Sequence, residues 1–404
     1  MSSPETTPVI LAARRTPIGR YLGGLAPLTA PQLGGLAIKA AVESAGIPAD
    51  AVEQVIMGHV LQGGTGQAPA RQASLAAGLP VGVTALTINK VCGSGLQAVM
   101  LAAQAIRAGD AQVIVAGGQE SMSNAPHYVF GMRGGVKIGD QSLVDGMIRD
   151  GLHCATYHCH MGGHAEYTAS KGGVSRADQD AFAADSHRKA VAAQQAGKFD
   201  AELVPVVLPG KKGDTVIAAD EGPRADTTAD SLAKLRPAFP KDAPKGTDPD
   251  TLSVTAGNAS SLNDGGAALV VTSEAFATAH GLPVLARITG SSTGAVDPRE
   301  LFFAPVTAVR ALMKKTGTAI GDYGLIEANE AFASQALADG RELGWAWDRV
   351  NVHGGAIALG HPIGASGARV LVTLLHAMRD RGAETGLATL CLGGGDAVAL
   401  SVAR

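Results

Sequence analysis

Apolar residues in the first 120 positions alternate between short runs typical of buried strands and longer stretches with helical spacing. The pattern predicts strands at residues 9–13, 52–57 and 112–116, helices at residues 33–45 and 68–77, and a strand–turn–helix unit at residues 86–106. This alternation of strand and helix predicts a mostly parallel sheet that is covered by helices on both faces. We therefore expect an α/β fold.

The unit at residues 86–106 is the most apolar part of this pattern. No charge occurs between Lys90 and Arg107, and apolar residues recur there at helical spacing, which is typical of a central, buried helix. Cys92 lies at the turn before this helix, where the helix dipole and free backbone N–H groups favour an anion. We expect this position to lower the pKa of the Cys92 thiol, so that Cys92 is a nucleophile. Gly93 and Gly95 leave room for a substrate carbonyl at the same turn.

The pattern changes between residues 119 and 252, where Gly, Pro, His and charged residues dominate. One clear helix is predicted at residues 175–196, with Ser175 as its N-cap and Gly197 at its end. The proline-rich stretch at residues 237–250 predicts an exposed loop. A turn and a strand then follow at residues 260–272. We interpret this region as an inserted domain within an α/β core.

The last third of the chain repeats features of the first. A helix that opens with Ser-Gly and ends at Gly382 matches the helix that begins at Ser94, and each is followed by a strand and a glycine run. Two similar halves packed together would place both helix N-termini near one centre. We predict an N-terminal half at residues 1–121, completed by residues 253–273, an insertion at residues 122–252, and a C-terminal half at residues 274–404.

The composition of the chain argues against several classes of protein. The chain has 404 residues, 46% of them hydrophobic, and a formal net charge of −3, so nothing indicates a nucleic-acid or anionic-membrane partner. The N-terminal residues do not resemble a signal peptide, and we expect neither a membrane span nor a membrane partner, so the predicted location is cytoplasmic. Four cysteines in a chain of this length predict free thiols rather than a disulfide framework.

The spacing of motif residues argues against several alternative kinds of site. The cluster His153, Cys154, His158, Cys159, His160 and His164 has the composition of a metal site, but adjacent loop residues rarely converge on one tetrahedron, so we predict no metal. The glycine runs lack the G-x-G-x-x-G and Walker spacings of nucleotide-binding loops. An α/β-hydrolase is disfavoured because no G-x-S-x-G sequence occurs.

Four strings carry a specific resemblance: VCGSG at residues 91–95, NEAFA at 329–333, NVHGGAIALGHPIGASGAR at 351–369 and CLGGG at 391–395. With GGQESMSNAPH at 117–127 and LAKLRPAF at 232–239, the chain resembles the thiolase family over nearly its whole length, and is most similar to the acetoacetyl-CoA type. The resemblance implies a five-layered α-β-α-β-α fold of two similar halves with an inserted loop domain. It also implies an acyltransferase that condenses two acetyl-CoA molecules to acetoacetyl-CoA and CoA. A 3-ketoacyl-CoA thiolase of β-oxidation and an inactive CoA-binding homologue remain the alternatives.

The resemblance also implies roles for individual residues. Cys92 would be acetylated, His361 would take its proton, and Cys391 would be the acid/base that forms the enolate. His361 and a water held by Asn329 would face the enolate oxygen, and the N–H groups of Cys92 and Gly393 would face the oxyanion of the acyl-enzyme. No cofactor is implied beyond the coenzyme A thioesters themselves.

Coenzyme A contacts in this family match nine positions of the chain: Leu152, His160, Met161, Arg224, Phe239, Ala256, Ser260, Ala331 and Phe332. The family forms dimers and often tetramers, so we expect a homo-oligomer, most simply a homotetramer. The chain departs from the family pattern in two places. Asp396 and Ala397 follow the CLGGG string, where we expect the carboxylate to point away from Cys391 or to be hydrogen-bonded. Phe302 and Phe303 occupy a segment that usually contains glycine beside the acyl pocket.

Overall fold

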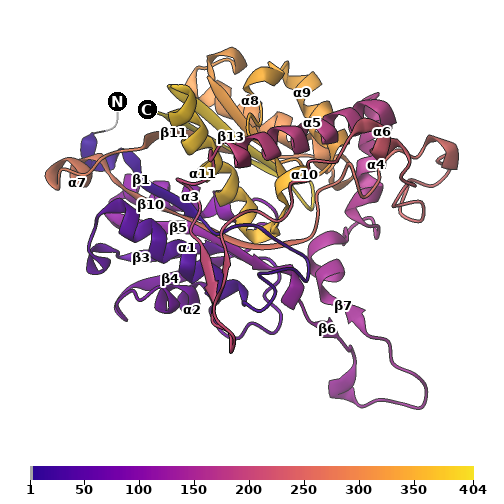
Figure 1. Ribbon diagram of the computed structural model, residues 1–404, viewed down its shortest axis with the longest axis horizontal. Coiled ribbons are helices and arrows are strands. Elements are labelled where there is room, and N and C mark those ends of the chain that lie inside the picture. The colour runs from indigo at the N-terminus through magenta and orange to yellow at the C-terminus, as the bar shows by residue number, and fades with distance from the viewer. Residues whose placement is uncertain (1–2) are drawn as a thin grey trace.

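The computed structural model describes residues 3–404, and its centre is one mixed sheet of ten strands (Figure 1). Nine strands follow the order β12-β13-β14-β11-β1-β10-β5-β3-β4, and β2 pairs with β10. The bounds are β1 Pro8–Arg15, β2 Gly19–Arg20, β3 Gln54–Gly58, β4 Thr84–Ile88, β5 Val113–Ser121, β10 Asn263–Ser273, β11 Ala286–Ala295, β12 Leu325–Ala328, β13 Thr385–Leu392 and β14 Asp396–Ala403. The sheet divides at a short contact between β1 and β11, where Val9 and Ile10 pair with Arg287 and Ala286. It therefore consists of two half-sheets.

The two half-sheets share one topology. In the N-terminal half the order is β1-β10-β5-β3-β4, and in the C-terminal half it is β11-β14-β13-β12. Strands β3, β4 and β5 are parallel, as are β12 and β13, whereas β10 and β14 are antiparallel to both of their neighbours in the same half. The expectation of a mostly parallel sheet is thus wrong for the strand pairs, of which three are parallel and six are antiparallel, because β10 and β14 run against the other strands of their halves. The internal repeat predicted from the sequence corresponds to this shared order.

Helices separate and cover the half-sheets, which gives the five predicted layers. Helices α3 (Ser94–Ala108) and α11 (Ile363–Arg381) pack against each other between the two half-sheets. Helices α1 (Ala30–Ala45) and α2 (Pro69–Ala76) cover the outer face of the N-terminal half, and α8 (Ala304–Thr316) covers that of the C-terminal half, with α9 (Ala333–Leu343) beside it. The short α7 (Glu274–Ala279) lies at the end of β10. The apolar character of residues 94–106 is explained by their place in the middle layer.

The inserted region lies between β5 and β10, where the other half has only the tight turn between β13 and β14. A projecting arm carries β6 (His127–Tyr128) and β7 (Val144–Asp145) and extends away from the core (Figure 1). The other regular elements of the insertion are α4 Met161–Lys171, α5 Arg176–Gln195, β8 Val206–Leu208, β9 Thr215–Ile217 and α6 Ala229–Ala233. The predicted helix at residues 175–196 is confirmed as α5, with a capping box between Ser175 and Asp178. The predicted domain boundaries stay a prediction.

Buried charge attaches the insertion to the core. The Arg15 side chain at the end of β1 donates to Glu202 at 2.6 Å and to Asp220 at 2.7 and 2.9 Å, and all three residues are buried. A buried ion pair of this kind is tolerated only when its hydrogen bonds are satisfied, so it holds these loops in one position. Within residues 3–404, no helix has both the length and the apolar character that crossing a bilayer requires.

Candidate active site

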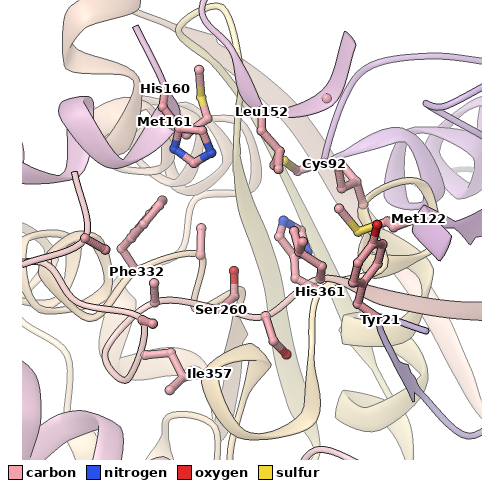
Figure 2. Close-up of a pocket in the computed structure, with 18 of the residues that line it drawn as sticks. Tyr21, Cys92, Met122, Leu152, His160, Met161, Ser260, Phe332, Ile357 and His361 are labelled. Carbon is pink, nitrogen blue, oxygen red and sulfur yellow. The ribbon is translucent and has the colours of Figure 1, made fainter. Parts of the chain in front are cut away.

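A cavity of about 620 Å³ opens where the two halves and the insertion meet. Cys92, His361, Cys391 and Gly393 all line it, although they come from segments far apart in the sequence. Figure 2 shows Cys92 and His361 together on one side of this space, with His160, Met161 and Phe332 on the opposite side. Asn329 does not line the cavity but is buried behind it. The predicted catalytic residues are therefore brought to one place.

The turn between β4 and α3 holds Cys92 in a strained position. Val91 has φ of 46°, which is unusual for a β-branched residue. Two contacts hold this backbone: the Val91 N–H donates to Asn89 Oδ1 at 3.0 Å, and the Ser94 hydroxyl donates to the Val91 carbonyl at 2.6 Å. A Cβ atom on Gly93 would lie 2.5 Å from Leu392, so glycine is required for the two halves to approach here. The strain thus lies directly beside the thiol, as is common at functional sites.

The ionisation of Cys92 differs from the sequence expectation. Burial raises the pKa of the Cys92 thiol to about 12, although the N–H groups of Gly393 and of Cys92 itself oppose this rise, and the Glu120 carboxylate adds to it. The predicted lowering of the pKa by the helix terminus is therefore wrong. The physical reason is that the first residue of α3 is Ser94, two residues beyond Cys92, while apolar groups surround the sulfur. Cys92 is protonated at neutral pH and needs a base.

His361 is arranged to be that base. Its Nδ1 atom lies 2.6 Å from Ser366 Oγ, and that hydroxyl donates to the Pro362 carbonyl at 2.9 Å, so Nδ1 carries the hydrogen. Nε2 then presents a lone pair and lies 3.5 Å from the Asn329 amide nitrogen. Burial, together with the nearby Arg369 charge, lowers the pKa of His361 to about 3. The imidazole is neutral in the resting site, and its unprotonated nitrogen is Nε2, which accepts a long hydrogen bond from the Asn329 amide.

Cys391 lies at the end of β13 in an apolar part of the cavity. Its neighbours in a buried cluster include Leu301, Phe302, Ala331 and Phe332. Burial raises the pKa of the Cys391 thiol well above its ordinary value, and negative charge on Cys92 or Asp339 would raise it further. Cys92 and Cys391 line the same cavity. Both thiols are therefore protonated at rest, with one neutral histidine beside them.

Known proteins share this arrangement of the chain. The N-terminal domain of the thiolase family matches residues 8–275, and its C-terminal domain matches residues 282–404. The chain belongs to the thiolase family. It is 56% identical to an acetyl-CoA acetyltransferase of Pseudomonas aeruginosa over 98% of its length and 99% of the relative, and 51% identical to a probable acetyl-CoA acetyltransferase of Escherichia coli over 98% of both. A crystal structure of an acetyl-CoA acetyltransferase from Bacillus anthracis has a TM-score of 0.94, 42% identity and 98% coverage of both chains.

The nine positions predicted to contact coenzyme A all line the cavity of this thiolase: Leu152, His160, Met161, Arg224, Phe239, Ala256, Ser260, Ala331 and Phe332. His160 caps α4 by accepting from the Gly162 N–H at 3.0 Å, and its ring stacks on Phe239 with centroids 4.7 Å apart. The Ser260 N–H donates to the Ala331 carbonyl at 3.0 Å, which joins the segment before β10 to the C-terminal half. Arg224 is exposed and so lies at the opening. Coenzyme A contact itself stays a prediction.

The cavity of the thiolase includes residues that the sequence reasoning missed. Helix α4, which carries Met161, was not predicted, because Gly162 and Gly163 make its start read as a loop; a Cβ on Gly162 would lie 2.2 Å from Phe239. His187 also lines the cavity and accepts from the Arg224 N–H at 3.2 Å, and burial with the Arg224 charge lowers the pKa of His187 to about 4. No sequence signal marked His187. Among residues 3–404, no three His, Cys, Asp or Glu side chains are placed to hold a metal ion.

The two departures from the family pattern have separate outcomes in the thiolase. Asp396 forms an ion pair with Lys90 and accepts from the Ala397 N–H at 2.8 Å, so its carboxylate is paired, as expected. Phe302 is buried, lines the cavity and meets Phe332 edge-on at 5.2 Å between centroids. Phe303 instead lies beneath the Lys171 ammonium, 5.3 Å from the ring centre. Of the two rings, Phe302 is the one that bounds the site.

Proposed function

We propose that this thiolase is an acetyl-CoA C-acetyltransferase, which condenses two acetyl-CoA molecules to acetoacetyl-CoA and CoA and also catalyses the reverse cleavage. The observation that carries the proposal is the meeting of two protonated thiols, a neutral histidine and two backbone N–H donors in one cavity. Relatives at 51–56% identity over nearly their full length carry this name. The reaction needs no cofactor, because the thioester itself activates the acyl group and its α-hydrogens.

Acyl transfer begins at Cys92. As its sulfur attacks the thioester carbonyl of the first acetyl-CoA, the thiol proton passes to His361 Nε2, which is the unprotonated nitrogen of the ring. The N–H groups of Cys92 and Gly393, which are directed at this sulfur, lie where the carbonyl oxygen becomes negative. The departing CoA thiolate takes the Cys391 proton. The site then holds acetyl-Cys92, an imidazolium and a Cys391 thiolate.

Condensation uses the thiolate formed in the first step. Cys391 removes a methyl proton from the second acetyl-CoA, and the imidazolium N–H and a water on Asn329 stabilise the enolate oxygen. The enolate carbon attacks acetyl-Cys92, and the leaving Cys92 sulfur recovers its proton from His361. All three groups return to their resting protonation states, so the raised pKa of both thiols and the lowered pKa of the histidine fit a closed cycle.

Two assays test this function against its alternatives. Purified protein should cleave acetoacetyl-CoA in the presence of CoA and should condense acetyl-CoA, and Cys92→Ala should abolish both reactions. An inactive CoA-binding homologue would bind CoA but give neither product. A 3-ketoacyl-CoA thiolase of β-oxidation would cleave eight-carbon 3-ketoacyl-CoA faster than acetoacetyl-CoA. The buried Phe302 ring beside Cys391 favours the short substrate.

We further propose a cytoplasmic homo-oligomer. Strand β4 is the outer strand of the N-terminal half-sheet and exposes Thr84 and Leu86, so its free edge is suited to pairing with a second copy. The arm at residues 127–145 exposes an apolar set that a monomer would leave in water: Val129, Phe130, Met132, Val136, Ile138 and Leu143. Dimers through the sheet edge and tetramers through the arm would cover both surfaces. Four free thiols fit a reducing compartment.

A further inference from the structure

The two N–H donors directed at the Cys92 sulfur come from opposite halves of the molecule. The Cys92 N–H belongs to the turn between β4 and α3, and the Gly393 N–H belongs to the turn between β13 and β14. Nearly 300 residues separate the two turns in the sequence. The position of one donor relative to the other therefore depends on contacts between the turns.

The contacts between these turns are close but mostly apolar. A Cβ on Gly93 would lie 2.5 Å from Leu392 and 2.9 Å from Val398, and a Cβ on Gly393 would lie 3.3 Å from Val91. Such contacts set the distance between the turns, but van der Waals contact has little directional preference and allows sliding. A directional contact is needed to fix how the turns align.

One polar interaction supplies that direction. Lys90 Nζ forms an ion pair and hydrogen bond with Asp396 Oδ2. Lys90 is two residues before Cys92, and Asp396 is three residues after Gly393, so the pair joins the two turns beside both donors. Neither side chain lines the cavity.

Both partners of this pair are anchored locally. The Lys90 N–H donates to Ser94 Oγ at 2.8 Å, and the second Asp396 oxygen accepts from the Ala397 N–H at 2.8 Å. Gly394 and Gly395, which precede Asp396, have φ of 90° and 89°, so the turn has a defined shape that reaches Asp396. The Lys90 backbone and the Asp396 carboxylate are thus each fixed to their own turn.

We infer that Lys90 and Asp396 are positioning residues that hold the Gly393 and Cys92 N–H groups in register on the Cys92 sulfur. The role of this alignment in catalysis rests on the proposed function. The position of the two N–H groups beside the Cys92 sulfur does not depend on that function. The side chains are 28% and 34% exposed, and partly exposed ion pairs contribute little to folding stability. The pair therefore acts on geometry more than on stability.

The test separates geometry from charge. Asp396→Asn and Lys90→Gln are each compared with the wild type, and the matched control is Asp380→Asn, which removes a similarly exposed pair with Lys198. The first readout is the rate at which iodoacetamide alkylates Cys92 as a function of pH, measured by peptide mass spectrometry. Removing an anion and removing a cation would shift the thiol pKa in opposite directions through charge alone. If the two N–H groups instead lose their alignment with the Cys92 sulfur, both variants should be alkylated at Cys92 more slowly than the wild type.

The second readout is the reaction itself. Each variant should lower kcat for acetoacetyl-CoA cleavage by about 10-fold, with KM and Tm close to those of the wild type. Asp396→Glu should restore part of the rate, the double variant should be no slower than either single variant, and Asp380→Asn should match the wild type. Shifts of alkylation in opposite directions, or unchanged kcat in both variants, would overturn the inference. Because alkylation needs no acyl substrate, a wild type that fails to cleave acetoacetyl-CoA would reject the proposed function without affecting the first readout.

Discussion

At the scale of single residues, the two thiols and the histidine of the resting site are all neutral. Cys92 and Cys391 both have raised pKa values, and His361 has a lowered one, because burial disfavours each charged form. A preformed thiolate is therefore absent from the mechanism proposed here, and the charges appear only as bonds change. The roles of the two thiols can then be separated by removing one at a time.

Cys391→Ala should separate the half-reactions. Acetyl transfer to Cys92 needs His361 as base and uses Cys391 only to protonate the departing CoA thiolate, which can leave without that proton, whereas enolate formation needs Cys391 as base. The variant should therefore form acetyl-enzyme from acetyl-CoA but should lose condensation by at least about 100-fold. Intact-protein mass spectrometry would detect the acetyl group, and acetoacetyl-CoA formation would be followed in parallel. Condensation near the wild-type rate would show that Cys391 is not the base.

His361 should make the protein less stable in acid. Its pKa is about 3 when folded and about 6.5 when unfolded, so the unfolded state binds more protons and stability falls as pH drops through this range. The full effect is about 5 kcal/mol at the lower end. Urea unfolding of the wild type and His361→Asn should show a stability difference that changes in favour of the variant as pH falls. Burial raises the pKa of Glu327 to about 8, so this residue stabilises the fold as pH falls. Because Glu327 is present in both proteins, its contribution cancels when the variant is compared with the wild type. A difference that is constant with pH would contradict the assignment.

The meeting of Cys92, His361 and Cys391 in one site could be predicted from the sequence, but the ionisation of Cys92 could not. A helix N-terminus is visible in the spacing of residues 92–106, whereas the desolvation of the sulfur depends on Leu152, Met122 and Ile363, which fold onto it from distant segments. His187 was missed for the same reason, since it approaches Arg224 only in the folded insertion.

At the scale of elements, the short helix η7 (Pro298–Phe303) divides two neighbouring aromatic side chains between two environments. Phe302 faces the cavity and contacts Phe332, while Phe303 lies under Lys171. The sequence marked this segment as unusual but could not tell which ring points inward, because both orientations satisfy its apolar pattern. Similarly, α5 was predictable from its caps, whereas α4 was hidden by glycines that pack against Phe239.

Phe302 should limit the length of the acyl chain. A ring that is packed against Phe332 and shares a cluster with Cys391 leaves little room for extra methylene groups, and forced overpacking costs about 1–3 kcal/mol. Phe302→Gly should therefore raise kcat/KM for six- and eight-carbon 3-ketoacyl-CoA relative to acetoacetyl-CoA by about 10-fold or more. Phe303→Gly is the matched control and should leave the ratio unchanged. Equal ratios in the wild type and Phe302→Gly would remove the proposed limit while leaving the reaction itself intact.

At the scale of the whole molecule, the two half-sheets are built on one plan, but only the N-terminal half has an outer strand in the place of β4, and one connection differs. The C-terminal half joins β13 to β14 by a glycine turn that carries Gly393, whereas the N-terminal half joins β5 to β10 through the whole insertion. The repeat was visible in the sequence because both middle-layer helices are apolar and are followed by glycine runs. The reversed direction of β10 and β14 was not visible in the sequence, because a buried strand has the same apolar pattern in either direction.

The projecting arm gives a prediction at this largest scale. Its apolar residues between Val129 and Leu143 are exposed in the single chain and lie outside the lining of the cavity, so their burial is expected in contact with another copy. Tyr128 and Val144 already pair across the base of the arm, so residues 129–143 can be replaced by Asn-Gly, which closes a two-residue hairpin. We expect light scattering to show a tetramer for the wild type and a dimer for the shortened chain, with kcat within about two-fold of the wild type. The matched comparison is Leu86→Lys on the free edge of β4, which should instead weaken the dimer, because it places a charge where two sheet edges would meet. An unchanged tetramer after the arm is removed would assign the assembly to other surfaces, and a monomer would place the arm in the dimer contact itself.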